Sequence, residues 1–382
     1  MTFIYFLLTF FLLYSGLHFY LFLKIRAAFH PGAIATVCLT ISFLFLGLAP
    51  LIVGIIERHG IALPVRLIAY IGYIWMGFIV LFFFPSLILD LGRSVLYLSA
   101  YAAHGHPARF NISPLYAFFI PFIVALGINI YGYFEATHIR TEKITIHTPK
   151  LPPEVGRLRI VQVSDIHIGL IIQEGRLRPI LDEIKKADPD ILVSTGDLLD
   201  GEINNLKKPM ELLKDMHPRY GKFAVTGNHE FYAGIQKAVV FTEGAGFKLL
   251  RGEGVTIAGV VNIAGIDDST GISMLIPARM PEKEVLTGLP QEHFTLLLKH
   301  RPDVNPEALG YFDLQLSGHT HKGQFFPFSI ITGLFFKHRQ AGYYELPKNS
   351  VLYINRGAGT WGPPIRFLAP PEITIIDLIP KK

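Results

Sequence analysis

The sequence predicts an α-helical membrane region followed by an α/β domain of two packed sheets with helices outside. Three observations lead to this prediction. Residues 1–140 contain long runs without a charged side chain, which is typical of helices that cross a bilayer. The later residues first alternate between short apolar strands and amphipathic helices, and then become rich in strands. Several of these strands end in aspartate, asparagine or histidine.

Charged residues are distributed unevenly along the 382-residue chain, which is 51% apolar. Residues 1–140 carry seven Lys or Arg and three Asp or Glu, whereas the remaining 242 residues are close to neutral at +1. The pI of about 9.1 is therefore mostly a property of the first part. Because the second part shows no clustered basic face, we expect no nucleic-acid binding. The single cysteine, Cys38, excludes a disulfide framework and a thiolate metal site in the second part.

Four apolar runs in the first part are each long enough to cross a bilayer. They cover residues 3–23, 33–56, 67–89 and 115–134. A helix needs about 20 residues to span about 30 Å of hydrocarbon, and tyrosine and tryptophan lie near the run ends, as at membrane interfaces. The first run could instead be a cleaved signal peptide. It lacks a basic leading segment and is longer than the apolar part of a signal peptide, so we expect a retained span.

These spans predict a multi-pass integral membrane protein with both chain ends on one side. The positive-inside rule assigns the side with more basic residues to the cytoplasm. The side of the α/β domain holds five basic residues and the other side holds four, so we expect this domain to be cytoplasmic. The five are Arg58, Arg66, Arg140, Lys143 and Lys150, and the four on the other side are Lys24, Arg26, Arg93 and Arg109. We expect no buried Asp, Glu, Lys or Arg inside a span, which favours an anchor over a transporter.

The expected domain boundaries are 1–140 for the membrane region, 141–153 for a linker and 154–382 for the α/β domain. Within the linker, Ile144 and Ile146 predict an edge strand, which Pro152 and Pro153 end. Further on, helices are expected at 174–187, 206–216 and 233–244. Strands are expected before Asp165, in short pieces between 247 and 267, and at 191–194, 223–225, 294–298, 314–316, 351–354 and 373–376.

Five strand ends carry residues that suit metal ligands. They are Asp165 and His167, Asp197, Asn228 with His229 and Glu230, His300, and His319 with His321. Carboxylate, imidazole and amide groups together suit Mn, Fe or Zn better than Mg or Ca. An aspartate can bridge two cations about 3.5–4 Å apart, and Asp197 is the natural bridge. Glycines at 196, 227 and 318 allow sharp turns and close approach, so we expect these ends to meet around two divalent metal ions.

Each of these motifs alone is common in ordinary turns and surface loops, and a lone histidine such as His300 is usually a surface or core residue. All five motifs occur in order, and each follows an apolar strand. This combination favours a metal site over ordinary turns and loops. Asp200 leaves two roles open, because it could orient the loop of Asp197 or cap the following helix.

The series of motifs resembles that of the calcineurin-like metallophosphoesterases over about residues 144–380. Segments 299–303, 355–357, 364–366 and 370–374 are similar to those of YkuE/YaeI-type phosphodiesterases. The apolar runs resemble the arrangement of transmembrane proteins with a metallophosphoesterase domain. One departure is Lys322, where glycine is common, and its charge at the rim favours anionic substrates.

The resemblance implies a four-layer αββα sandwich and a role for each motif residue. One metal would be held by Asp165, His167 and His321, the other by Asn228, His300 and His319, with Asp197 as the bridge. His229 would act as general acid beside the leaving group, and Glu230 would support the ligands.

From the ligands we expect the two cations to lower the pKa of a shared water, so that hydroxide attacks phosphorus near neutral pH. The expected function is a membrane-anchored phosphoesterase that cleaves phosphodiester or pyrophosphate bonds of a phosphorylated small molecule or a lipid-linked substrate. Two alternatives stay open: a phosphoprotein or phosphomonoester phosphatase, and a transporter or receptor whose phosphoesterase-like domain only binds.

Overall fold

The structure is a computed structural model of the chain that describes residues 2–57, 62–103, 112–201, 206–276, 279–337 and 339–381. Two compact units make up the chain. The first is Met1–Tyr133 with Gly362–Ile365, and the second is Phe134–Trp361 with Arg366–Lys382. Arg58 and Arg109, which contributed to the predicted orientation, lie outside the described residues.

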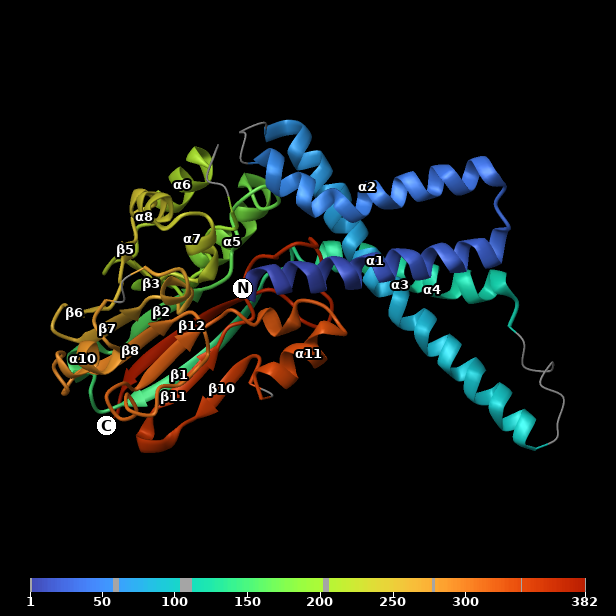
Figure 1. Cartoon of the computed structure of the whole chain (residues 1–382). Coiled ribbons are helices and arrows are strands. Elements are labelled where there is room, and N and C mark those ends of the chain that lie inside the picture. The colour runs from blue at the N-terminus through green and yellow to red at the C-terminus, as the bar shows by residue number, and fades with distance from the viewer. Residues whose placement is uncertain are drawn as a thin grey trace. The chain divides into compact units, whose positions relative to one another are not determined.

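The first unit contains four helices that are long and apolar enough to cross a membrane (Figure 1). They are α1 (Thr2–Phe29), α2 (Ala33–Glu57), α3 (Ala62–Ala102) and α4 (Pro114–Glu135). Each predicted apolar run lies inside one of them. α3 extends well beyond the predicted run 67–89, because residues 91–102 remain mostly apolar and contain no proline that would end a helix.

The continuation of α3 places Asp90, which we expected just beyond the run 67–89, inside a helix of the membrane unit, where its side chain is half-buried. The carboxylate of Asp90 accepts hydrogen bonds from Lys24 Nζ and Tyr20 OH, both at 2.6 Å. An isolated charge in hydrocarbon costs about 3 kcal/mol or more, and such charges are therefore found paired. The pair joins α1 to α3 and offsets the cost of both charges.

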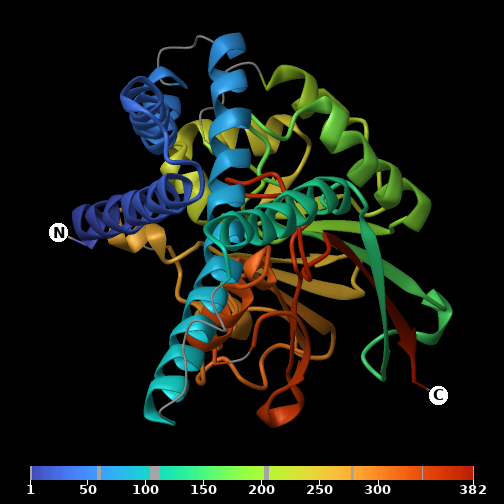
Figure 2. The same cartoon turned by 90° about the vertical axis from the view of Figure 1, so that its right-hand side faces the viewer.

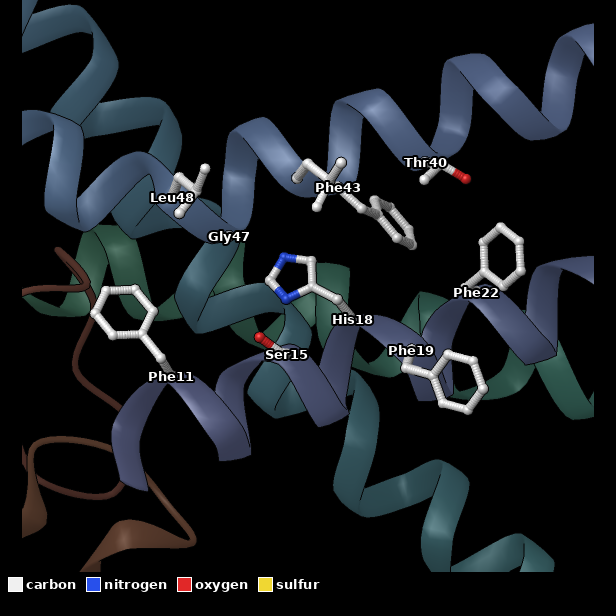
Figure 3. A pocket seen from close by; sticks show the side chains of 10 residues that line it. Phe11, Ser15, His18, Phe19, Phe22, Thr40, Phe43, Gly47 and Leu48 are labelled. Carbon is white, nitrogen blue, oxygen red and sulfur yellow. The ribbon is translucent and has the colours of Figure 1, made fainter. Parts of the chain in front are cut away.

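A cavity of about 460 Å³ lies between α1 and α2 and is lined largely by phenylalanine. His18 projects from α1 towards Gly47 of α2, where a Cβ atom would lie 3.8 Å from the imidazole (Figure 3). Trp75 Nε1 donates to His18 Nε2 at 2.9 Å, and His18 Nδ1 lies 2.8 Å from the carbonyl oxygen of Tyr14. Both ring nitrogens have partners, so this imidazole is a packing element of the helices.

The second unit is built on two six-stranded sheets. In spatial order, the first sheet contains β1 (Arg140–Thr148), β12 (Glu372–Pro380), β2 (Leu158–Val163), β3 (Ile191–Ser194), β4 (Lys222–Ala224) and β5 (Lys248–Leu249). The second contains β10 (Gly342–Glu345), β11 (Val351–Ile354), β9 (Leu314–Ser317), β8 (Phe294–Lys299), β7 (Val261–Ile266) and β6 (Glu253–Ile257). As predicted from Ile144 and Ile146, β1 is an edge strand, and both side chains pack against the core.

The hydrophobic core of this unit lies between the two sheets. The first sheet contributes Ile160, Val193 and Ile376, and the second contributes Ile263, Leu296 and Leu316. Helices α5 (Glu174–Ala187), α6 (Lys207–Lys214) and α8 (Ile235–Gly244) lie on the side of the first sheet, and α10 (Glu282–Thr287) on that of the second (Figures 1 and 2). The apolar helices followed by a two-sheet α/β fold confirm the predicted fold class.

Three short helices complete the unit: α7 (Asn228–Tyr232), α9 (Thr270–Ser273) and α11 (Phe328–Phe335). The predicted helix 233–244 begins later than expected, because Gly234 has φ +97° and separates α7 from α8. Strands β2, β3 and β4 run parallel, as do β7, β8 and β9. The carboxyl ends of each set therefore lie along one edge of its sheet, where ligands of α/β folds usually bind.

Replacing Asp377 with Asn is expected to lower the thermal stability of the second unit, because Arg159 Nε and Nη2 donate to its carboxylate at 2.7 and 2.9 Å. Hydrogen bonds to a charged group contribute about 1.5–3 kcal/mol. The Arg159 guanidinium holds the pKa of Asp377 below its usual value, so the wild type loses this stability as pH falls through the acidic range.

The measurement is the apparent unfolding midpoint of the full chain in detergent from pH 6 to pH 3. The Asp377→Asn midpoint should start lower and converge on that of the wild type at low pH. Glu183→Gln, which removes an exposed pair with Lys186, is the control and should shift the midpoint less. Parallel pH profiles for the wild type and Asp377→Asn would contradict the prediction.

Candidate metal centre

The five strand ends singled out in the sequence converge on one buried cluster. Asp165 and His167 follow β2, Asp197 follows β3, Asn228 and His229 open α7, His300 follows β8, and His319 and His321 follow β9. All of these residues are buried except His319, which is half-buried. The structure therefore brings together every residue that we predicted for the site.

The ligand atoms fall into three overlapping groups, in each of which all atoms lie within 4.8 Å of one another. The groups are Asp165, His167 and His321; Asp197, His300 and His319; and His167, Asp197 and His229. Asp197 and His167 each belong to two groups. The first group contains the three residues expected at one metal position, and the second contains His300 and His319 of the other together with Asp197. The bridging role of Asp197 stays a prediction.

The distances between donor atoms suit divalent cations. Asp197 Oδ2 lies 3.2 Å from His300 Nε2, and Asp165 Oδ1 lies 3.3 Å from His321 Nε2. His321 Nε2 also lies 3.0 Å from His167 Nε2. Two nitrogen ligands about 2.1 Å from one cation, at roughly a right angle, are about 3 Å apart, so the ring nitrogens face each other at a ligand-like spacing.

Asn228, the residue before His229, offers a further candidate oxygen donor. Asn228 Oδ1 is buried and has no hydrogen-bond partner among the described residues. Leaving a buried polar atom unpaired costs about 1–3 kcal/mol, which a metal bond would offset. The oxygen and nitrogen donors of the cluster therefore fit one or more divalent ions.

Two histidines of the cluster are kept neutral, as ligands must be. Burial lowers the pKa of His321 well below its usual value, and the nearby Arg366 guanidinium adds to this effect. Burial also lowers the pKa of His319 to about 3, with contributions from His300 and Arg301. Their lone pairs are consequently available at neutral pH.

The two aspartates of the cluster respond differently to burial. Burial by itself would raise the pKa of Asp197, but His300 and His229 hold it well below its usual value. Burial raises the pKa of Asp165, and the charge of Asp197 adds to this rise while His300 opposes it. The central carboxylate is therefore anionic, as a group shared between cations should be.

The backbone of the site is strained. Asp165, His167, Asp197, His319 and His321 all have φ between +49° and +69°, the left-handed region that side chains other than glycine rarely adopt. Each such residue costs about 1–2 kcal/mol. Strain of this kind persists only where the surrounding structure enforces it, and it gathers at functional sites.

Glycine permits the closest backbone approach at the centre. Gly196 has φ +93°, and a Cβ atom there would lie 2.6 Å from the Gly227 nitrogen and 2.8 Å from His300 Nδ1. The ends of β3, β4 and β8 consequently touch at a point where no side chain fits. This observation agrees with the close approach expected at these glycines.

Asp200 contacts two histidine rings of the site. Its carbonyl oxygen lies 2.7 Å from His229 Nδ1, and its carboxylate lies 3.3 Å from the same atom and 3.5 Å from His167 Nδ1. α6 begins at Lys207, so Asp200 does not cap it. Burial would lower the pKa of His229, but the carboxylates of Asp197 and Asp200 together raise it to about 10.

Glu230 holds the loop of Asp197 in place. Its carboxylate accepts hydrogen bonds from the backbone N–H groups of Gly227, Asp197 and Leu199 at 2.6, 3.0 and 3.1 Å. Burial raises the pKa of Glu230, and the charge of Asp197 adds to this rise. Glu230 thus has the loop-orienting role that the sequence left open for Asp200.

Two arginines of the site had no role in the sequence analysis, although both lie in the family motifs. Arg366 is fully buried and donates to the carbonyl oxygens of Arg356 and Gly357 at 2.8 and 3.1 Å. Its Nη2 lies 3.1 Å from His321 Nδ1. Arg301 donates from Nε to Asp268 at 2.8 Å, and its Nη1 lies 2.9 Å from His319 Nε2. The sequence offered one signal for both arginines, namely their place in the motif segments 299–303 and 364–366.

Lys322, which we expected at the rim, lines a polar cleft of about 450 Å³ together with Lys143 and Arg356. None of the candidate metal ligands lines this cleft. The charge of Lys322 therefore faces a neighbouring cleft, and its effect on substrate choice stays a prediction.

Comparisons with known proteins agree with this geometry. Residues 158–323 match the family model described as calcineurin-like phosphoesterase. An uncharacterized metallophosphoesterase of Aquifex aeolicus is 39% identical over 67% of this chain and 97% of its own length. The uncharacterized metallophosphoesterase YkuE of Bacillus subtilis is 33% identical over 66% of this chain and 90% of its own. A transmembrane protein with metallophosphoesterase domain of Danio rerio is 31% identical over 67% of this chain and 61% of its own length.

Replacing Gly318 with Ala is expected to abolish metal binding at one position, because the added Cβ would collide with Ser164 Oγ and with Asp165 Oδ2. Metal content per chain, measured by mass spectrometry of the purified protein, should fall by at least half. Gly175→Ala is the control, since a Cβ there meets nothing within 4 Å. Full metal content in the Gly318→Ala chain would show that Asp165 is not a ligand.

Proposed function

Because the chain belongs to the calcineurin-like phosphoesterase family, we propose that it is a membrane-associated, metal-dependent hydrolase of phosphodiester or pyrophosphate bonds. Its substrate would be a phosphorylated small molecule or a lipid-linked phosphate. The observation that carries the proposal is the position of Asp197, which shares one group of ligand atoms with His300 and His319 and whose Oδ2 lies 3.9 Å from Nε2 of His167 in another group. One carboxylate shared by two ligand sets is the arrangement that two-metal phosphoester hydrolysis requires.

The proposed ligand sets follow the geometry of the cluster. One divalent cation would be held by Asp165, His167 and His321, and the other by Asn228, His300 and His319, with Asp197 shared between them. When bound, Mn, Fe or Zn ions at these positions would lower the pKa of a water molecule and neutralise charge on the phosphoryl oxygens.

His229 is the side chain best placed to protonate the leaving group. The Asp200 carbonyl oxygen lies 2.7 Å from its Nδ1, which leaves Nε2 for the substrate. Burial would lower the pKa of this ring, but the carboxylates of Asp197 and Asp200 raise it, which favours the protonated form that a general acid needs. Asp197 and Asp200 supply the negative charge that stabilises this protonated ring.

The surroundings of His229 favour a diester over a monoester. The rings of Tyr232 and Trp361 lie 5.5 and 6.0 Å from the His229 ring, measured between centroids, and both residues are exposed. Aromatic side chains beside the proton donor can contact a second organic group, which a diester has and a monoester lacks.

His229→Ala is expected to keep its bound metal and to lower kcat by about 10²–10⁴-fold, the usual contribution of a positioned acid. Metal content and hydrolysis of bis-p-nitrophenyl phosphate are measured on the full chain in detergent. The matched variant Asp197→Asn should lose both metal and activity. Equal loss of metal and activity in His229→Ala would make His229 a ligand.

Substrate preference separates the proposed function from its alternatives. With Mn, Fe or Zn added, the full chain should hydrolyse bis-p-nitrophenyl phosphate faster than p-nitrophenyl phosphate or a phosphopeptide. Faster cleavage of the latter two would indicate a phosphatase. A chain that binds metal but hydrolyses none of the three would contradict the hydrolase proposal and favour a binding-only domain.

A further inference from the structure

The helix after the last two candidate ligands is apolar and largely exposed. α11 has the sequence Phe-Ser-Ile-Ile-Thr-Gly-Leu-Phe, and only Gly333 within it is buried. Ile330, Leu334 and Phe335 are 56%, 68% and 80% exposed. A scattered apolar side chain on a surface is ordinary, but a helix that exposes most of its apolar residues indicates a contact with another phase or partner.

Neighbouring segments extend this surface. Phe325 and Phe367 form an isolated parallel β-bridge. The bridge brings the next residues along each segment, Phe326 and Leu368, close together, and both are exposed. Two hydrogen bonds with Gln324, at 2.8 and 2.9 Å, hold the exposed Trp361 against the turn that precedes α11. We call this surface the apolar rim; it consists of Phe326, Ile330, Leu334, Phe335, Trp361 and Leu368.

The apolar rim borders the candidate metal centre at two points. The ring of Phe336, the residue that ends α11, lies 5.8 Å from the ring of His319, and the Trp361 ring lies 6.0 Å from that of His229. A Cβ atom at Gly323 would collide with the backbone of Ser329, so α11 also packs directly on the turn that carries His321. A surface contacting the apolar rim would therefore lie beside the reacting groups.

The connection to the membrane helices indicates what covers the apolar rim. α4 ends at Glu135 and β1 begins at Arg140. Even fully extended, this connection reaches about 18 Å at most. The α/β unit consequently stays at the surface of the membrane into which α4 inserts, so a bilayer is the apolar phase always within reach.

Charge and residue type agree with a bilayer. The exposed Lys337 and Arg339 follow α11, and Lys322 precedes it. Basic residues beside an exposed apolar helix are complementary to anionic lipid headgroups, and tryptophan is enriched at the membrane interface.

We propose that the apolar rim inserts into the interfacial layer of the bilayer, and that the site therefore acts on a phosphate ester or anhydride whose organic group is a membrane lipid. The second half rests on the proposed function, whereas the insertion does not. Held in this way, the metal centre would meet a lipid phosphate at headgroup depth, without extracting the lipid from the bilayer.

Site-directed spin labelling of the full chain tests the insertion. A nitroxide is attached at Leu334→Cys or Phe335→Cys in a Cys38→Ser background, in vesicles of phosphatidylcholine and phosphatidylglycerol. Val240→Cys on α8 is the control, because Val240 is also apolar and is 71% exposed. We expect labels at 334 and 335 to collide with oxygen several-fold more than with a water-soluble nickel complex, and the label at 240 to show the reverse. If the labels at all three positions collided more often with the nickel complex than with oxygen, the proposal would be overturned.

Kinetics test the substrate class. Leu334→Glu/Phe335→Glu should lower kcat/KM at least tenfold for the dioleoyl phosphatidyl ester of p-nitrophenol in vesicles, yet leave bis-p-nitrophenyl phosphate turnover within twofold. Val240→Glu should change neither. An equal fall for both substrates would overturn the lipid assignment. Inserted labels in a chain that cleaves neither ester would instead reject the proposed function and keep the insertion.

Discussion

The candidate metal centre depends on the carboxylate of Asp197 being held where the two sheets meet. Asp197 follows a strand of the first sheet, and its partner at 3.2 Å, His300, follows a strand of the second. A buried carboxylate without a partner costs several kcal/mol, so neither sheet provides a stable site by itself. The three backbone N–H groups that bind Glu230 fix the position of the Asp197 loop.

The strained backbone of the site is a consequence of the same convergence. Several ligand residues adopt left-handed conformations because their chains must turn sharply at the end of a strand and still direct a side chain inward. The apolar core shared by both sheets supplies the stability that holds this strain. Arg366 contributes locally, since its guanidinium binds carbonyl oxygens of the turns around His321. The candidate ligands are thereby held in place by contacts within the protein.

The polar side chains of the apolar helices and those of the α/β unit are arranged differently. Among the apolar helices, two pairs of polar side chains bond to each other, namely Asp90 with Lys24 and His18 with Trp75. In the α/β unit, aspartate and histidine side chains gather in the buried cluster of candidate ligands, whereas apolar side chains of α11 are exposed. A cluster of charged groups beside an exposed apolar surface suits an amphiphilic molecule with a phosphate head.

The sequence by itself determined the four apolar helices, because a backbone in hydrocarbon must satisfy its hydrogen bonds within a helix. It also determined the candidate ligands, since polar residues directly after parallel strands gather at one edge of a sheet. Only the tertiary structure decided that Asp90 pairs with Lys24, that Arg301 and Arg366 lie against ligand histidines, and that α11 stays exposed. These features depend on contacts between residues far apart in the chain, which no local pattern of residues specifies.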